Sequence, residues 1–128
     1  MASVLVASAL ISPLGAFASS GSPILTTTYT LLGSPRQSTL NGLPCIKANY
    51  LNAAGSNTAL GVVYAVVHNP LGQIVLMTPA AITPAAGANA TAFLIIAGLQ
   101  GGVYSVSVFA VDENDIAISI SSSIQVTL

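Results

Sequence analysis

The C-terminal segment of the chain alternates between apolar and polar side chains. The apolar residues occupy even positions and are Ile116, Ile118, Ile120, Ile124, Val126 and Leu128. The polar residues occupy odd positions and are Ser119, Ser121, Ser123, Gln125 and Thr127. Successive side chains of a β-strand point to opposite faces of its sheet. The pattern therefore predicts one long strand, Ile116–Leu128, with one buried face and one face toward water.

The segment before it, Val103–Val111, alternates in the same way. The residues between the two segments, Asp112–Asp115, have the side chains that favour tight turns. Two alternating runs joined by turn residues are typical of a β-hairpin. We therefore expect these segments to pair as antiparallel strands.

Two further runs, Leu60–Val67 and Ala92–Ala97, are apolar at consecutive positions and rich in β-branched or aromatic residues. This composition favours strands over helices. A strand that is apolar on both faces is either buried inside a sandwich or covered by a neighbour.

Turn-forming residues separate the apolar runs at short intervals, among them Asn41-Gly42, Asn69-Pro70 and Gly101-Gly102. The expected strands are Leu25–Leu32, Cys45–Leu51, Leu60–His68, Gln73–Thr78, Thr91–Ala97, Val103–Val111 and Ile116–Leu128. This spacing predicts an all-β protein, an immunoglobulin-like antiparallel β-sandwich of about seven strands.

Charged side chains are scarce: 4% of the 128 residues are charged, whereas 53% are hydrophobic. Soluble domains usually contain about 25% charged residues. A surface without charge does not keep a monomer dispersed, so we expect packing against a membrane, partner subunits or a glycan coat. With so few basic residues, the chain has no basic surface for phosphates, and we expect no nucleic-acid partner.

The segment 1–18 is apolar, but Pro13 and Gly15 interrupt it, so we expect no stable transmembrane span. Ala16-Phe17-Ala18 is similar to the end of a signal peptide, although no basic residue precedes it. The alternatives are a degenerate signal peptide and a mature apolar arm that a partner buries. We divide the chain into an N-terminal arm, residues 1–23, and a sandwich domain, residues 24–128.

Residues able to carry catalysis are few. His68 is the only histidine, and the acidic residues Asp112, Glu113 and Asp115 all lie in one predicted turn. A serine triad needs a histidine beside both an acid and a nucleophile, and no Gly-x-Ser-x-Gly motif occurs. Cys45 is interpreted as a small buried side chain rather than a reactive thiol or an interchain disulfide. We therefore expect no enzymatic activity, no cofactor and no metal ion.

One glycosylation motif, Asn89-Ala90-Thr91, occurs in the chain. It follows Ala85-Ala86-Gly87, so we expect it in a loop where a glycan on Asn89 would stand clear of the sheet. A glycan is one physical answer to an uncharged surface.

The stretch Ala97–Val106, where a glycine-containing loop leads into an alternating strand, resembles immunoglobulin and fibronectin type III modules, and the likeness extends over Cys45–Leu128. The whole chain, with its apolar arm, Ser/Thr-rich strands and few charges, resembles subunits of archaeal extracellular filaments: threads, bundling pili and type IV-like pili. For threads and bundling pili the resemblance implies donor-strand complementation, in which an N-terminal strand completes the sheet of the next subunit. The long helix of type IV-like subunits fits less well, because Pro13, Gly15, Gly21 and Pro23 would break it.

The donor-strand arrangement also has a physical basis. A strand inserted into another subunit is buried on both faces, and Val4–Ile11 is apolar at nearly every position. The expected subunit-interface residues are Val4, Leu5, Val6, Leu10 and Ile11. Head-to-tail contacts that do not close into a ring generate a filament, that is, a helical homopolymer. The expected function is a structural subunit of an extracellular cell-surface filament; the alternative is a secreted or cell-surface binding or adhesion module with residues 1–18 as its signal peptide.

Overall fold

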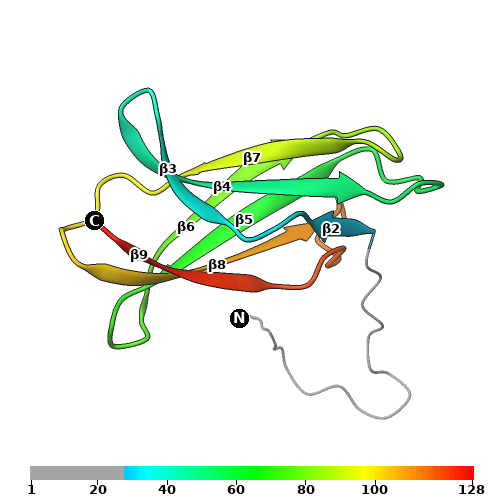
Figure 1. The fold of residues 1–128 in the computed structure, drawn as a ribbon. Coiled ribbons are helices and arrows are strands. Elements are labelled where there is room, and N and C mark those ends of the chain that lie inside the picture. The colour runs from blue at the N-terminus through cyan, green and yellow to red at the C-terminus, as the bar shows by residue number, and fades with distance from the viewer. Residues whose placement is uncertain (1–27) are drawn as a thin grey trace, which may run out of the picture.

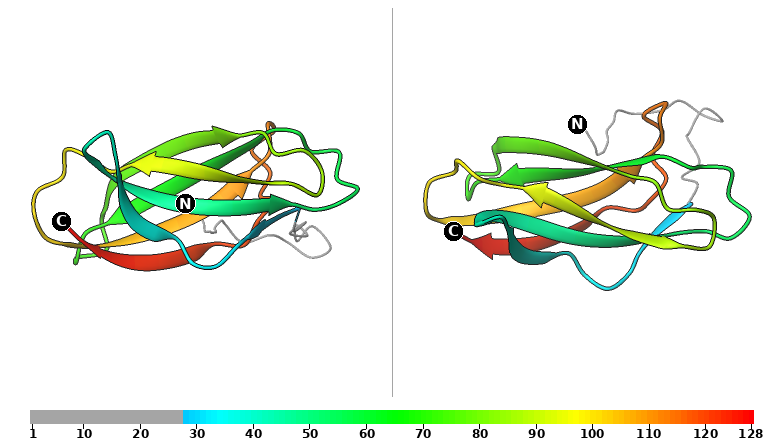
Figure 2. Two further views of the ribbon diagram at one scale, coloured as in Figure 1. Left: turned by 45° about the horizontal axis from the view of Figure 1, so that its top comes forward. Right: turned by 90° about the horizontal axis from the view of Figure 1, so that it is seen from above.

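The computed structural model describes residues 28–128, which form two antiparallel sheets packed face to face (Figures 1 and 2). The strands are β2 (Tyr29–Leu31), β3 (Arg36–Leu40), β4 (Leu43–Asn52), β5 (Gly61–His68), β6 (Ile74–Ile82), β7 (Asn89–Ile95), β8 (Val103–Val111) and β9 (Ser122–Thr127). No helix occurs in this part of the chain, and the predicted all-β immunoglobulin-like sandwich is confirmed. The expected arm, residues 1–23, and the boundary at residue 24 lie outside the described residues.

The central strand of the first sheet is β4. It pairs with β7 along one edge and with both β2 and β3 along the other. β3 uses residues 43–47 of β4 and β2 uses residues 50–52, so together they form one interrupted edge strand. The strand predicted at Leu25–Leu32 is therefore confirmed only for its part at Tyr29–Leu31.

β3 was not predicted, and it belongs to a tight hairpin with β4. The hairpin loop is Asn41-Gly42, and both residues have positive φ angles, 53° and 79°. Positive φ at both central positions is the signature of a type I′ turn, which matches the twist of paired strands and favours Asn-Gly. The turn was visible in the sequence, but the polar composition of Arg36–Leu40 hides the strand before it.

The second sheet has the order β6-β5-β8-β9, and all its pairs are antiparallel. The predicted pairing of the last two strands is confirmed, and β8 has the predicted bounds. β6 runs further than expected, to Ile82, and contains Pro79. Proline is tolerated there because β6 is an edge strand.

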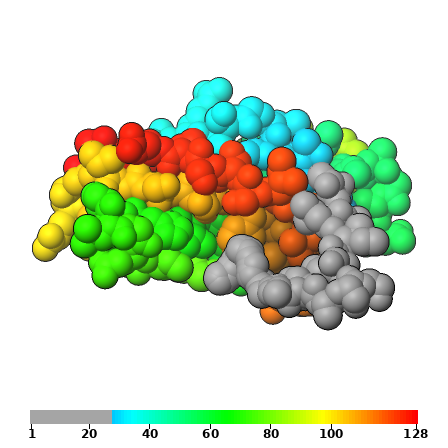
Figure 3. Space-filling view, turned by 90° about the horizontal axis from the view of Figure 1, so that it is seen from below, coloured from blue at the N-terminus to red at the C-terminus, as the bar shows by residue number. Residues whose placement is uncertain are grey.

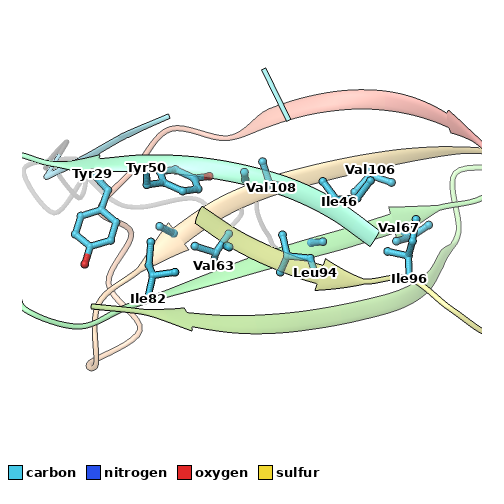
Figure 4. Packing of buried hydrophobic residues seen from close by; sticks show 14 of the residues in the cluster. Tyr29, Ile46, Tyr50, Val63, Val67, Ile82, Leu94, Ile96, Val106 and Val108 are labelled. Carbon is cyan, nitrogen blue, oxygen red and sulfur yellow. The ribbon is translucent and has the colours of Figure 1, made fainter. Parts of the chain in front are cut away.

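The hydrophobic core fills the space between the sheets (Figure 4). Most of its large, fully buried side chains come from the inner faces of four strands, and Tyr29 of β2 and Val126 of β9 add to them. Those of the four strands include Ile46 and Tyr50 of β4, Val63 and Val67 of β5, Leu94 of β7, and Val106 and Val108 of β8. Within a strand these residues are two or four positions apart, as expected for one face of a sheet.

Gly61, at the start of β5, is required by a close approach. A Cβ atom at this position would overlap the ring of Tyr29, which is fully buried at the end of the core. Glycine therefore lets β2 lie close to the start of β5. This close approach sets the position of β2, the first described strand, in the sandwich.

The predicted long C-terminal strand is wrong over its first half. Only Ser122–Thr127 forms β9, and the preceding residues 116–121 form a loop that contains one isolated bridge, between Val111 and Ala117. Ile116 and Ile120 are 57% and 60% exposed, whereas Ser119, which we expected to face water, is 4% exposed.

Hydrogen bonds explain this departure from strand geometry. The Ile118 carbonyl accepts from the backbone N–H groups of Thr28 and Tyr29, at 2.9 and 2.8 Å, so the loop is tied to the other sheet. The Ser119 hydroxyl accepts from the Ala110 N–H at 2.8 Å and donates to the Ile120 carbonyl at 3.1 Å. A side chain thus replaces part of the ladder that a regular strand would make.

Candidate functional site: the two outer faces of the sandwich

The residues considered for catalysis are separated in the structure. His68 ends β5 and lies opposite Ser105 and Ile74, whereas the acidic turn follows Val111, which lies opposite Val62 near the other end of β5. Within residues 28–128 no group of three His, Cys, Asp or Glu side chains is close enough to hold a metal ion. The structure therefore does not assemble these residues into one site.

Cys45 has the predicted environment, because it is a free cysteine with no exposed surface. Burial raises the pKa of its thiol, and the nearby charge of Lys47 offsets part of this rise. A raised pKa lowers the fraction of reactive thiolate. The interpretation as a buried structural side chain is the one that this burial favours.

The acidic residues form the predicted turn after β8. The Asp112 carboxylate accepts from the N–H groups of Asn114 and Ile116, at 2.8 and 3.0 Å, and Asp115 has a positive φ of 62°. This carboxylate therefore organises the turn backbone, a common role of aspartate in loops.

The surface of the described chain has open hollows, and two of them are considered for ligand binding. The larger, about 490 Å³, is lined by Asn69, Pro70, Val75 and residues 98–104, and the smaller, about 220 Å³, by residues 57–60 and 112–114. The larger hollow has no charged side chain, and the Tyr104 hydroxyl at its wall donates to the Gln100 carbonyl at 2.8 Å. Its polar groups are therefore backbone, amides and one phenol.

The outward side of the second sheet is covered by apolar side chains. In register across three strands lie Val62, Tyr64 and Val66 of β5, Met77, Pro79 and Ala81 of β6, and Phe109 of β8. We call this set the apolar outer face. None of these side chains is charged; Met77 is 53% exposed, and those on β5 and β8 are half-buried. Figure 3 looks onto this side of the molecule, where the green β5–β6 region lies beside β8 and β9.

An aromatic pair lies within the apolar outer face. Tyr64 and Phe109 occupy opposite positions on β5 and β8, and their rings stack with centroids 5.7 Å apart. Toward β9 the same side of the sheet becomes polar: Ser107 and Ser123 share a hydrogen bond of 2.7 Å. The apolar outer face is thus bounded by a hydroxyl-rich edge, as the apolar centre of an interface is bounded by a polar rim.

The outward side of the first sheet has a different composition. It presents Arg36 and Ser38 of β3, Lys47 and Asn49 of β4, and Asn89, Thr91 and Phe93 of β7, and we call this set the mixed outer face. Both basic residues of the chain are on it, directly opposite each other. The Lys47 ammonium lies 5.9 Å from the centroid of the Phe93 ring. This separation is within the range of a cation–π contact.

Asn89, the predicted glycosylation site, is exposed, but its expected position in a loop is wrong. It begins β7 and pairs with Leu51 of β4. Thr91 of the same motif is also exposed and lies on the same side of the strand. Both side chains therefore point outward from the mixed outer face, where a glycan would stand clear of the sandwich.

The predicted subunit-interface residues Val4, Leu5, Val6, Leu10 and Ile11 lie outside the described residues. The described chain begins at Thr28, at the end of β4, where the Ala53 N–H donates to the Thr28 carbonyl at 2.8 Å. The expectation for the arm therefore stays a prediction.

The core contains two tyrosine hydroxyls that the sequence did not indicate. The hydroxyls of Tyr29 and Tyr50 are buried without a hydrogen-bond partner, and their rings lie 6.3 Å apart. Burial raises the pKa of Tyr50 to about 12 and also raises the pKa of Tyr29. The nearby Ser119 side chain lowers the pKa of Tyr50 and so offsets part of this rise. The Ser119 hydroxyl, however, has its own hydrogen bonds, to the Ala110 N–H and the Ile120 carbonyl.

Comparison with known proteins gave no relative: no protein-family model and no curated protein matches the chain. The described residues also contain no helix of sufficient length and apolarity to span a bilayer.

The sequence indicates the part of the apolar outer face that lies on β5, but not the parts on β6 and β8. Apolarity on both sides of Leu60–Val67 indicated a strand covered by a neighbour, and Tyr64 and Val66 are outward residues of that strand. Met77 and Phe109 were not identified, because the sequence does not state which strands flank β5. Only the strand register places them beside Tyr64 and Val66.

Proposed function

We propose that this chain is a structural subunit of an extracellular filament, assembled from identical copies in a head-to-tail manner. Neighbouring copies bury the apolar outer face, and the N-terminal arm of each subunit, with Val4, Leu5, Val6, Leu10 and Ile11 at the contact, completes the sheet of the next. The proposed role is structural, without catalysis.

The apolar outer face is the observation that supports this proposal. An antiparallel sheet that faces water normally places polar residues on that side. Here Tyr64, Phe109 and Met77 occupy it instead, and Ile74, 58% exposed, extends it. Covering such a face with another subunit removes apolar surface from water, which stabilises association by about 25 cal/mol per Å².

The low charge of the chain supports the same proposal. Two basic and three acidic residues give little repulsion between copies, so association meets no electrostatic barrier. In the proposed contact the arm of one copy meets the sheet of the next, and repeated contacts between two different surfaces build open chains when they do not close into a ring.

The mixed outer face suits the exterior of such a filament. It has both basic residues and the exposed motif at Asn89, so it can remain hydrated and can carry a glycan. We therefore infer that glycans on Asn89 would cover part of the outside of the filament.

Sedimentation velocity and negative-stain electron microscopy of the purified full chain test the proposal. We expect fibres of uniform width at micromolar concentration and a sedimenting species far larger than one chain. A single species of monomer mass at all concentrations would contradict the filament and would favour the secreted binding module.

A further inference from the structure

The free edge of β7 differs from the other strand edges of the described sandwich. The first sheet is three strands wide, because β2 and β3 share one edge of β4, whereas the second sheet has four strands. In a constant-type immunoglobulin sandwich a fourth strand lies next to the strand equivalent to β7. Here the strand between β5 and β7 in the sequence, β6, pairs with β5 in the second sheet instead.

Two backbone hydrogen bonds show which groups of β7 face this edge. The Ile96 N–H donates to the Pro44 carbonyl at 3.0 Å, and the Asn52 N–H donates to the Ala88 carbonyl at 2.8 Å. In an antiparallel pair, alternate residues direct both backbone groups to the same neighbour. Even-numbered residues of β7 therefore face β4, and the N–H and carbonyl groups of Thr91 and Phe93 face outward.

The other edges are each protected in a way that β7 is not. β6 contains Pro79 and a register shift opposite Val67 and His68. β9 is covered at its end by Gln37, whose side-chain amide donates to the Thr127 carbonyl at 2.9 Å. The β2/β3 edge is interrupted. Prolines, bulges and covering side chains are the usual devices that prevent strand addition at an edge.

β7 has none of these devices within its bounds. Its sequence, Asn89–Ile95, has no proline and no charged residue, and Phe93 is 39% exposed. Its backbone is therefore open to another strand, in the manner of β-augmentation.

The inner side of β6 is well covered only at the end of the strand, where Ile82 is buried; before it the first sheet covers β6 less completely. Leu76 and Ala80 face the core but are only partly buried, whereas Val63, Ala65 and Val67 on the neighbouring β5 have no exposed surface. A strand added beside β7 would lie on the side of the sandwich where β6 is incompletely covered. It would supply the missing apolar contacts for Leu76 and Ala80.

We propose that the free edge of β7 is the acceptor site for residues 4–11 of another copy of this chain. This inference rests on the proposed filament and names the strand that receives the arm. As a strand, the segment would extend about 26 Å, at about 3.3 Å per residue. That length is close to the length of β7, which spans 7 residues. The segment has no charge, so one side can meet Leu76 and Ala80 while the other continues the outer face beside Phe93.

The chain between this segment and Thr28 is long enough to reach a neighbour. Residues 12–27 can span up to roughly 53 Å when extended, which exceeds the radius of a domain of this size several times. Backbone hydrogen bonds to β7 would provide affinity, and the alternating apolar side chains would fix the register.

The test is the full-length variant Phe93→Pro with Phe93→Ala as its matched control. Both remove the ring and its contact with Lys47, but only proline removes the outward N–H of residue 93. We expect Phe93→Ala to form fibres. Phe93→Pro should remain folded, as judged by circular dichroism, but should lose at least about tenfold in assembly. Because Phe93→Pro still carries a donor segment, a small fraction of it should also shorten wild-type fibres.

The outcomes separate this inference from the function on which it rests. Fibres of normal length from Phe93→Pro would overturn the assignment of β7 and leave the filament intact. Absence of fibres from the wild-type chain would overturn the filament itself.

A disulfide experiment covers the case in which Phe93→Pro does not fold. Thr91→Cys is combined in one full chain with Val4→Cys, Leu5→Cys or Val6→Cys, and the products of mild oxidation are separated under denaturing conditions. We expect a ladder of covalent multimers for at least one pair. No ladder for any pair, or a cross-link confined to single chains, would overturn the proposal.

Discussion

The two outer faces of this sandwich come from the same architecture and differ in what they present to solvent. On the mixed outer face, Arg36, Lys47 and Thr91 stand among a few apolar neighbours. On the apolar outer face, Tyr64, Phe109 and Met77 occupy the equivalent outward positions. A hydrophobic core stabilises a sandwich whatever its outer faces contain, so the fold alone does not explain this difference.

In a chain with so few charges, the position of each charged residue is informative. Both basic residues lie on one outer face, and all the acidic residues lie in the turn after β8. The apolar outer face has none of them. In the proposed filament another subunit buries this face, which would account for its lack of charge.

A charge placed on each face gives the largest expected contrast. Val66→Lys would put an ammonium into the buried contact, at a cost of about 3 to 5 kcal/mol for an uncompensated charge. The concentration needed for assembly should rise at least about 100-fold, as measured by sedimentation. Ser38→Lys is the comparison, because Ser38 is on the mixed outer face but on β3, the strand on the far side of β4 from β7. We expect it to leave the fold intact and to change assembly far less. Equal effects of the two would abolish the distinction between the faces.

Measurements at alkaline pH can distinguish unfolding of the chain from loss of assembly. The Tyr50 pKa of about 12 lies above the ordinary value of 10, so the folded state holds this proton more tightly than the unfolded state. The stabilisation is complete below about pH 10 and is lost as the pH rises toward 12, by roughly 2 to 3 kcal/mol. The raised pKa of Tyr29 acts in the same direction.

Denaturant unfolding at several pH values, followed by circular dichroism, measures this effect. Tyr50→Phe has no ionisable hydroxyl, so its stability should fall less steeply between pH 10 and pH 12. Parallel curves for the two chains would show that Tyr50 is not responsible. Assembly lost well below pH 10 would have to come from the faces rather than from this part of the core.

The aromatic contacts of the two faces should differ in their contribution to stability. Phe109→Leu breaks the stack with Tyr64. This change should destabilise the dispersed subunit by about 1 to about 2 kcal/mol. Lys47→Met breaks the cation–π contact with Phe93 and also removes repulsion from Arg36. Its cost should therefore be about 0.5 kcal/mol or less. A larger cost for Lys47→Met in denaturant unfolding would reverse the expected order.

The smallest effect concerns the like charges on the mixed outer face. Arg36→Gln removes the charge opposite Lys47. It should stabilise the subunit by a few tenths of a kcal/mol, which is the amount that cross-strand pairs usually contribute. At about 1 M salt the Debye length falls to about 3 Å, so wild type and variant should become equal. A difference that persists at high salt would indicate another cause.

The sequence predicted the strands that can be recognised from the pattern of their own apolar side chains. β8 and most of β4, β5 and β7 were found because their apolar residues recur with a period of two or run continuously. β3 was missed because the sequence Arg36–Leu40 is polar and is held by the Asn41-Gly42 turn. The segment 116–121 alternates like a strand, but the bonds of Ile118 and Ser119 to distant backbone groups take it out of the sheet.

The candidate site was only partly predictable for a related reason. The sequence indicates that Leu60–Val67 needs cover on two sides, and this follows from composition alone. It does not contain the register that brings Met77 and Phe109 beside it, nor the absence of a strand next to β7 within the described sandwich. Those features depend on which strands pair, which is settled by the fold as a whole.

Selective chemical labelling of Met77 and Lys47 tests the central claim most directly. Met77 is 53% exposed on the apolar outer face, and Lys47 is the single lysine of the chain, exposed on the mixed outer face. Mass spectrometry would compare peroxide oxidation of Met77 and acetylation of Lys47 in fibres and in dispersed chains. We expect fibre formation to slow Met77 oxidation by about tenfold or more, as for a side chain removed from solvent, with Lys47 labelled at a similar rate in both. Equal oxidation of Met77 in the two states would contradict the burial of the apolar outer face between subunits.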